Sequence, residues 1–205
     1  MDWKQWFAGQ VANSGMEVAQ VPLRNIAPDW GMLPDGDFGR PDGKFFTYVG
    51  VRVTMKKDQR EVSSWVQPMI CEYGEGAVVV IKARGEEKFL LQAKPEPGND
   101  YKNGQLMLNA PLSASVSNLQ AAHGGKRPPR AELLDQGTKL MVIPQDGGKY
   151  LRKKNHYGWV EADPAAIVPN ANERWFTLEE IREAMQEGLV SEHLCQALLT
   201  SLLKL

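Results

Sequence analysis

The stretch QAKPEPGND, residues 92–100, gathers polar side chains among two prolines and a glycine, directly behind the apolar run KFLLQA. Glu96 can remove a proton as a carboxylate, while Lys94 and Asn99 can donate hydrogen bonds to a developing negative charge. The prolines restrict the backbone and so reduce the entropy lost when these groups are ordered. We therefore take this turn as the first candidate for acid–base chemistry, with an exposed turn as the structural alternative.

Other candidates lie further along the chain. His123 precedes two glycines, where it can titrate near neutral pH or simply bond its own backbone. His156 and Tyr157 lie together in NHYGW and form a second candidate acid/base pair. Cations that suit phosphate groups are Lys126, Arg127, Arg130, Arg152, Lys153 and Lys154, although the RKK run also fits a solvated strand edge.

The composition limits the classes of function. The chain has 205 residues, 42% of them hydrophobic, which fits one domain over residues 1–205 with a sizeable core. A net charge of −1 provides no general attraction to nucleic acid or membrane, so we expect neither as a partner. Cys71 and Cys195 lack the spacing of a zinc site or a disulfide framework, and the chain starts without signal-peptide features. We expect a soluble cytoplasmic protein.

The elements that must position these groups form an α+β pattern. Trp3, Trp6 and Phe7 have helical spacing within an N-terminal helix or arm over 1–20, and residues 22–43 are rich in Pro, Gly and Asp, which predicts loop. A strand-rich body is predicted over 21–162, followed by helices over 175–205 that begin at Thr177 and Ser191. The predicted strands are 45–53, 65–70, 77–83, 88–94, 104–110, 138–145, 149–154 and 158–162, and a short helical piece falls near PPRAELLDQ.

Common catalytic motifs are missing from the sequence. No Walker A, GxGxxG or GxSxG pattern occurs, so phosphate loops, dinucleotide folds and hydrolase elbows have no support. REAMQEG is similar to part of the Nudix metal-binding helix, but the upstream glycine and glutamate of that box are missing. We interpret it as a solvated helix face and expect no metal site.

Several separated motifs carry a resemblance to a known family. FLLQAKPEPGN, SASVSN, HGG and PP resemble the signature region of the NDP-hexose 2,3-dehydratases. FFTYVGVRV, WVQPMI, LRKKNHYGWVEA and WFTLEEIREAM resemble segments of the same family in the same order. The resemblance covers nearly all of the chain from Val21.

The resemblance implies a Nudix-like α+β fold, with a mixed β-sheet body, flanking helices and no Nudix metal box. It implies a nucleotide-diphosphate sugar as substrate and no metal or redox cofactor. Members of the family carry two tandem copies of such a unit, so a homodimer is expected, with an exposed face of Trp3, Trp6 and Phe7 as its candidate contact. An unstable product implies a downstream NADPH-dependent ketoreductase.

The implied reaction removes water across carbons 2 and 3 of a nucleotide-linked 4-keto-6-deoxyhexose in deoxysugar biosynthesis. Because the ketone acidifies the proton on carbon 3, the reaction needs a base, donors to the enolate oxygen and an acid for the leaving water. Glu96 and His123 are equal candidates for the base, Lys94 and Asn99 for the donors, and Tyr157 for an acid or base. A related isomerase, a dehydratase on a different keto sugar and a non-catalytic binding subunit remain alternatives.

Substrate binding is assigned to a wider set of residues. The remaining predicted substrate-binding residues are Ser117, Asn118, Asn155, Gln67, Arg127, Arg130, Lys154 and Trp65. Trp65, Trp159 or Tyr157 can stack on the base, although both tryptophans also suit a core. Where the family has QLSPTVQATRSN, this chain has MLNAPLSASVSN, which puts Met107, Pro111, Ser113 and Val116 at positions expected to face the substrate. Arg40 replaces a family histidine.

Overall fold

The computed structural model describes residues 2–57, 59–100, 102, 104–135 and 138–203. The helices are α1 (Trp3–Ala12), η1 (Leu23–Ile26), α2 (Val116–Leu119), η3 (Ala131–Asp135), η4 (Pro164–Ala166), α3 (Leu178–Gln186) and α4 (Glu192–Leu202). The strands are β1 (Gly31–Met32), β2 (Phe38–Gly39), β3 (Thr47–Thr54), β4 (Ser64–Cys71), β5 (Gly76–Ala83), β6 (Lys88–Pro95), β7 (Leu106–Asn109), β8 (Leu112–Ala114), β9 (Lys139–Pro144), β10 (Lys154–Ala162) and β11 (Glu173–Thr177). The predicted α+β class is confirmed.

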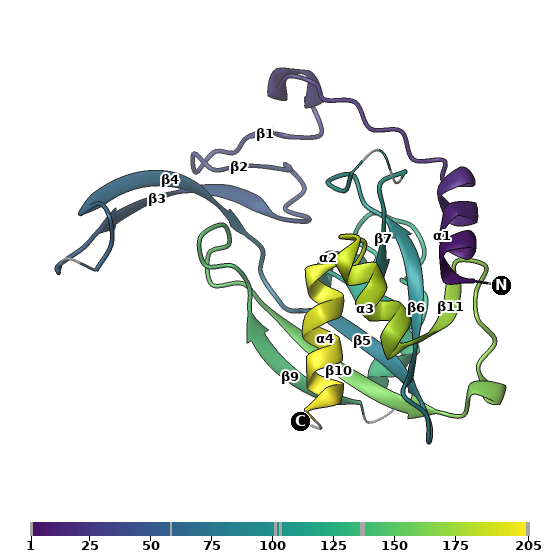
Figure 1. Cartoon of the computed structure of the whole chain (residues 1–205). Helices are drawn as coiled ribbons and strands as arrows, with labels where there is room; N and C mark the ends of the chain where they lie inside the picture. Colours follow the sequence, from purple (N-terminus) through teal and green to yellow (C-terminus); the bar gives the residue numbers. More distant parts are fainter. Residues whose placement is uncertain (1, 58, 101, 103, 136–137, 204–205) are drawn as a thin grey trace.

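A seven-stranded mixed sheet forms the body of the molecule (Figure 1). Its main path runs β11-β6-β5-β10-β9, while β7 pairs with β6 and β8 pairs with β5. The β5 and β10 strands are parallel, and the other pairs of this sheet are antiparallel. The strands β5 and β6 pair with each other over only part of their length. Beyond that part β6 pairs with β7 and β5 pairs with β8, so polar residues of several strands meet at this end of the sheet.

Both faces of the central strand are buried. Val78 and Val80 of β5 lie in a core with residues of α1, α3 and α4, whereas Val79 and Ile81 lie in a second core with Leu133 of η3. The continuous apolar run AVVVI therefore fits a strand covered on both faces. Figure 1 shows α3 and α4 side by side over one face of this sheet.

A second sheet extends away from the body (Figure 1). It has the order β1-β2-β3-β4, and the long hairpin of β3 and β4 pairs from Thr47 and Cys71 to Thr54 and Ser64. The segment 22–43 was expected to be loop, but it contains η1, β1 and β2. Trp30, Phe38 and Phe46 pack together there, so clustering of aromatic rings supports strands of two residues that local propensity did not indicate.

The predicted N-terminal helix is present, but its aromatic face is buried rather than exposed. Trp3 and Phe7 are 2% and 5% exposed and belong to the core beneath α1. Trp6 meets Phe176 edge to face at 5.6 Å, and the Trp3 indole donates to Glu183 Oε2 at 3.0 Å. The expectation that this face contacts a second copy is therefore wrong, because it packs on its own chain.

The C-terminal helices begin where the sequence predicts. Thr177 and Glu180 form the expected capping box of α3, and Ser191 accepts from the backbone N–H of Leu194 at the start of α4. Within α3 the buried face contains Ile181 and Ala184, whereas Met185 is 51% exposed.

Two boundaries differ from the prediction. The strand-rich part continues beyond residue 162, because β11 pairs with β6 through five residue pairs. Residues 149–153 were predicted to start the return strand of the DGG hairpin, but β10 begins at Lys154. Lys149 and Tyr150 instead donate to Asp146 O in a turn, and this leaves the loop free to reach toward β4.

Candidate active site

A partly enclosed polar cavity of about 190 Å³ opens where β6, β8 and β10 meet the start of α4. It is lined by Glu72, Val78, Lys94, Glu96, Ser113, Ala114, Ser115, Asn118, Gln145, Tyr150, Lys153, Asn155 and His193. These residues come from six elements, β5, β6, β8, α2, β10 and α4, and from the loops between elements, so the cavity exists only in the folded chain.

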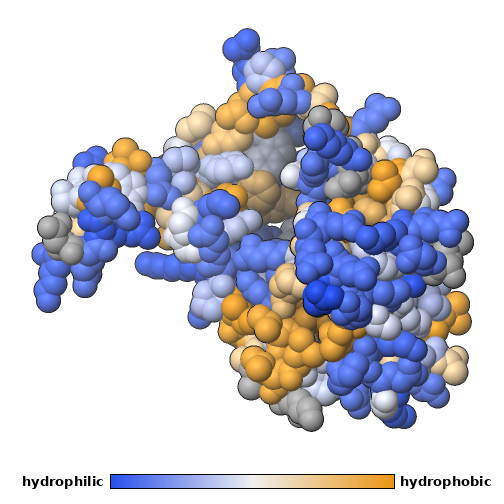
Figure 2. All heavy atoms as spheres, in the orientation of Figure 1, coloured by the Kyte–Doolittle hydropathy of each residue, from blue (hydrophilic) through white to orange (hydrophobic). Residues whose placement is uncertain are grey.

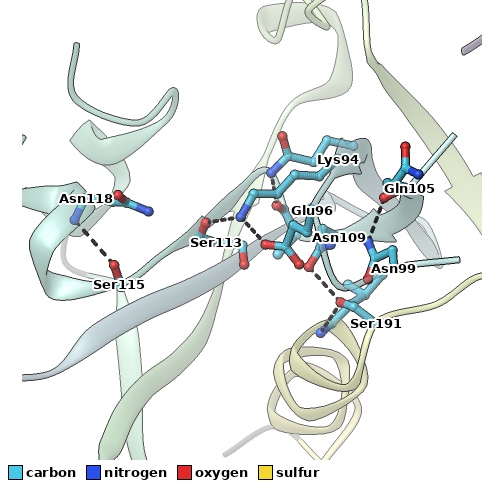
Figure 3. Close-up of polar contacts among 12 residues, drawn as sticks. Lys94, Glu96, Asn99, Gln105, Asn109, Ser113, Ser115, Asn118 and Ser191 are labelled. Carbon is cyan, nitrogen blue, oxygen red and sulfur yellow. Dashed lines mark hydrogen bonds and ion pairs between the residues drawn. The ribbon is translucent and has the colours of Figure 1, made fainter. Parts of the chain in front are cut away.

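Lys94 and Glu96 form an ion pair on the cavity wall. The Lys94 ammonium lies 2.7 Å from Glu96 Oε1 and donates to the Ser113 carbonyl at 2.9 Å (Figure 3). The two side chains are 26% and 41% exposed, so both remain open to a ligand. Lys94 lies at the end of β6 and Glu96 lies just beyond that strand, and both side chains line the cavity.

Asn99 maintains the turn rather than lining the cavity. Its amide donates to Gln105 O at 2.8 Å, and the backbone N–H of Glu96 donates to the same carbonyl at 3.1 Å (Figure 3). The Asn99 N–H donates to Glu96 O at 3.0 Å. These bonds close the PEPG turn on itself, so Asn99 holds Glu96 in position instead of contacting a ligand in the cavity.

Tyr157 lies behind the wall and supports His193, which lines it. The Tyr157 side chain is fully buried, and its hydroxyl oxygen lies 2.7 Å from both Gln145 Nε2 and His193 Nδ1. Burial raises the pKa of the Tyr157 phenol. Burial lowers the pKa of the His193 imidazole, against the opposing effect of the Glu192 and Glu96 carboxylates. Both groups are therefore neutral at neutral pH.

A buried ion pair lines another part of the cavity. Lys153 and Glu72 have side chains 3% and 11% exposed, and Lys153 Nζ lies 2.8 Å from Glu72 Oε2. The ammonium also donates to Gly74 O at 3.0 Å, while the Ser117 hydroxyl donates to the other Glu72 oxygen at 3.3 Å. Ser115 Oγ lies 2.9 Å from Ser117 Oγ. This network presents fixed dipoles and charges to a polar ligand.

The start of β5 is held tightly against the cavity wall. Asn155 Oδ1 accepts from the Gly76 N–H at 3.0 Å. A Cβ atom on residue 76 would lie 2.5 Å from the Ala114 carbonyl oxygen and 2.9 Å from Asn155 Oδ1. Glycine is therefore required here, because it allows the backbone to approach both groups. Asn118, on α2, lies on the same wall with its backbone N–H bound to Ser115 Oγ (Figure 3).

The structure brings part of the predicted set together. Lys94, Glu96, Asn118 and Asn155 line the cavity, and Ser117 and Tyr157 contact lining residues from behind. His123 lies elsewhere, on an exposed loop where its Nδ1 accepts from Gly125 N at 2.8 Å. This bond is the backbone contact that we gave as the alternative, so Glu96 is retained as the candidate base and His123 is not.

Several predicted binding residues also lie outside the cavity. Arg130 donates to Glu173 Oε2 at 2.7 Å and to the Val168 carbonyl at 2.8 Å, so it joins the loop before η3 to β11 and to the loop that precedes β11. Trp65 donates to Gln67 Oε1 at 2.6 Å, and the Gln67 amide donates to Gly148 O at 2.8 Å, so both join β4 to the 146–149 turn. Arg127 and Lys154 are exposed, and Lys154 borders two hollows beside the cavity.

The positions at which the chain differs from the family pattern do not all face the cavity. Ser113 lines it, as expected. Pro111 is buried, and its carbonyl accepts from Gln92 at 3.1 Å. The Val116 side chain packs against Gly74, close to where a Cβ atom on that glycine would lie. Met107 lies opposite Lys94 in the pair of β6 and β7. Arg40 donates a hydrogen bond to Asp42. Apart from Ser113, these positions lie outside the cavity lining, so the cavity gives no support to the expectation that they face the substrate.

The sequence reasoning missed Glu72, Gln145, Tyr150 and His193. None lies near the QAKPEPGND turn along the chain, and each reaches the cavity only through long-range packing. One feature of the sequence could have indicated His193: it is a titratable residue in the first turn of a capped helix. Among the described residues, no group of three or more His, Cys, Asp or Glu side chains is arranged to hold a metal ion.

The fold and the cavity define a class of protein: an α+β domain with two carboxylates, two ammonium groups and an imidazole around a space sized for a small polar ligand. Comparison with known proteins gives the family. The family model described as NDP-hexose 2,3-dehydratase matches residues 1–202, so the chain belongs to this family.

Three similar relatives are all called dTDP-4-dehydro-6-deoxy-alpha-D-glucopyranose 2,3-dehydratase. The protein of Streptomyces violaceoruber is 26% identical over 191 residues, covering 89% of this chain and 41% of the relative. The proteins of Saccharopolyspora spinosa and Amycolatopsis orientalis are 28% and 27% identical, covering 88% and 91% of this chain and 37% and 41% of the relatives. The chain thus spans about two fifths of the length of these relatives.

Proposed function

We propose that the chain catalyses removal of water across carbons 2 and 3 of a nucleotide-linked 4-keto-6-deoxyhexose, as a step in deoxysugar biosynthesis. Family membership and the names of the relatives support this reaction class. The observation that carries the proposal is the Lys94–Glu96 ion pair, which lines a partly enclosed cavity together with His193. A base beside hydrogen-bond donors is the arrangement that proton abstraction next to a ketone requires.

In this mechanism Glu96 takes the proton from carbon 3, which the ketone at carbon 4 has made acidic. The electrons of the C3–H bond first enter the enolate, whose oxygen is stabilised by the Lys94 ammonium. When the ketone at carbon 4 forms again, these electrons make the C2=C3 double bond and the carbon 2 hydroxyl is expelled. The hydroxyl takes the proton from Glu96 and leaves as water. The enol product then relaxes to a 3,4-diketo sugar, and no electron carrier enters the balance.

The remaining polar groups suit the rest of the substrate. Glu72, Asn118 and Asn155 can bond the sugar hydroxyls from the cavity wall. Two neighbouring hollows share lining residues with the cavity and are bordered by Arg152 and Lys154. Because a diphosphate needs cations at an accessible site, we assign it to these two side chains.

Assembly and location follow as further parts of the proposal. Figure 2 shows hydrophobic side chains gathered in the lower middle of the view, where Figure 1 places the end of α4 beside β9. Exposed apolar residues of these elements include Val142, Leu199 and Leu202. Contiguous apolar surface marks an interaction site, so we assign the homodimer contact to this patch. The free cysteines, Cys71 and Cys195, fit a reducing cytoplasm, where an NADPH-dependent ketoreductase would consume the product.

Assembly and location are open to direct checks. A molar mass of one chain in solution would contradict the homodimer. Within the described residues, no helix has the length and apolar character needed to cross a membrane.

The reaction is tested by incubating the pure protein with dTDP-4-keto-6-deoxyglucose and an aromatic diamine, which traps vicinal diketones. Mass spectrometry should detect the adduct of a sugar that has lost one water. Unchanged substrate, with a thermal shift showing that it binds, would contradict the proposal and favour a non-catalytic binding role.

A further inference from the structure

We infer that His193 is a further catalytic residue, a neutral Nε2–H donor in the cavity wall, and that Tyr157 is the positioning residue that fixes its hydrogen. This inference rests on the proposed function for the reaction that the donor serves. The hydrogen position itself follows from the contacts of three side chains, Gln145, Tyr157 and His193.

The first step concerns the Tyr157 hydroxyl. It has one hydrogen to donate and an oxygen that accepts. The side chain is fully buried, and because burial raises its pKa the phenol keeps this hydrogen. A buried hydroxyl hydrogen without an acceptor would be costly, so it must point to one of the polar side chains around it, which are Gln145, His193 and Asn155.

The second step concerns those neighbours. Gln145 presents its Nε2 to the phenol oxygen at 2.7 Å, and an amide nitrogen can only donate. The phenol therefore accepts from Gln145. Asn155 Oδ1 already accepts from the Gly76 N–H, so we assign the phenol hydrogen to His193 Nδ1, also at 2.7 Å. Nδ1 must then carry a lone pair and no hydrogen.

The third step locates the ring hydrogen of His193. Burial lowers the pKa of the imidazole, so the ring carries one hydrogen near neutral pH. Since Nδ1 accepts from Tyr157, this hydrogen is on Nε2. The ring is bound to Tyr157 through its Nδ1, while the side chain lines the same cavity as Lys94 and Glu96, so Nε2–H is the group it has left to offer a ligand.

A neutral donor at this position has a defined use. It bonds the ketone oxygen and strengthens that bond as negative charge develops on the enolate, without carrying a charge that must be desolvated. Lys94 alone would divide its ammonium between the enolate and the Glu96 carboxylate. A second donor on α4, in the wall of the same cavity, shares the enolate oxygen with Lys94, so Lys94 can keep its contact with the base.

The hydrogen position is tested by NMR on protein labelled with ¹⁵N-histidine. The chain contains three histidines, and His193→Gln identifies the resonance that belongs to His193. Long-range ¹H–¹⁵N correlation near pH 7.5 should show Nε2 protonated and Nδ1 unprotonated. Tyr157→Phe removes the hydrogen that Nδ1 accepts and should shift the tautomer balance. A protonated Nδ1 in the unaltered protein would overturn the inference, whether or not the enzyme is active.

The catalytic role is tested by kinetics on the same keto sugar. His193→Ala should lower kcat about 100-fold or more, the usual cost of one oxyanion donor. Tyr157→Phe should lower kcat more than it changes KM, while Tyr48→Phe, which removes an exposed phenol hydroxyl on β3, should match the unaltered protein. Normal kcat in His193→Ala would overturn the role while leaving the dehydration intact. Absence of turnover in every protein would overturn it together with the proposed function.

Discussion

Glu96 is held at the cavity by its neighbours rather than by burial. Lys94 contacts its carboxylate, and the backbone bond from Glu96 N to Gln105 O fixes the turn that carries it. Glu96→Gln keeps the shape of the side chain but removes its ability to accept a proton. We predict a decrease in kcat of about 10²–10⁴-fold, the usual contribution of a general base, with KM little changed. Steady-state assay of diketone formation measures both constants.

The same sequence offers a matched control for this substitution. Glu86 forms an ion pair with Lys88, two positions away, on the exposed β5–β6 hairpin. Glu86→Gln removes the same charge from a similar pair outside the cavity, so its kcat should equal that of the unaltered protein. Equal losses in the two variants would mean that charge, and not the position of Glu96, determines the rate.

His193 should also make the fold sensitive to acid. Its folded-state pKa is lowered, so between that value and about 6.5 the unfolded chain binds a proton that the folded chain does not. The unfolding free energy therefore falls as pH falls below about 6.5, with a slope of at most about 1.4 kcal/mol per pH unit from this group. Urea unfolding from pH 7.5 to 5.5 measures this slope. His193→Gln should reduce it, and an identical slope in the variant would contradict the lowered pKa.

At the residue scale, the sequence predicted groups that follow one another along the chain. Lys94 and Glu96 could be found because their turn has a defined chemistry and a clear preceding strand. His193 and Glu72 could not, because no local pattern places a helix start and a strand end beside that turn. His123 was chosen for its residue type alone, and it lies on an exposed loop outside the cavity lining, so its catalytic role stays a prediction.

Among the elements, the loop before η3 and the strand β11 are joined by Arg130. Its partner Glu173 has a side chain 1% exposed and accepts from both the guanidinium and the Asn170 N–H. Arg130→Ala would leave a buried carboxylate without its main countercharge. We predict a loss of about 3–5 kcal/mol in the free energy of unfolding, measured by urea denaturation.

Arg127 provides the comparison for this element. It is exposed and three positions away, so Arg127→Ala should change the unfolding free energy by less than about 0.5 kcal/mol. Similar losses in both variants would contradict a structural role for Arg130 and return it to the set of candidate phosphate ligands.

Elements with strong local signals were predicted well. The strands β3, β4, β5 and β6 and the starts of α3 and α4 all follow from period, turn chemistry and caps. The strand β11 was missed because it forms by pairing with β6, which is far away in the sequence. The two-residue strands β1 and β2 were missed because packing of aromatic rings, and not local propensity, supports them. The pairing of β10 with β5 joins residues far apart along the chain, so no local pattern predicts it.

For the whole molecule, α1 joins the N-terminus to the C-terminal part of the fold. Trp3 and Phe7 close one side of the core, and Lys4 pairs with Glu187 at the surface. Trp3→Ala should therefore lower the unfolding free energy by about 3–5 kcal/mol without changing the oligomeric state. Urea denaturation and light scattering measure the two quantities. A change in molar mass without loss of stability would restore this face as a contact between copies.

The central claim is that the cavity bearing Glu96 removes the proton on carbon 3. It is tested most directly with a 4-keto-6-deoxyhexose nucleotide carrying deuterium at carbon 3, followed by mass spectrometry of the sugar. The unaltered protein should release the deuterium at least as fast as product forms, and Glu96→Gln should slow the release about 100-fold or more. Loss of water with the deuterium retained at carbon 3, or release at the normal rate in Glu96→Gln, would contradict the claim.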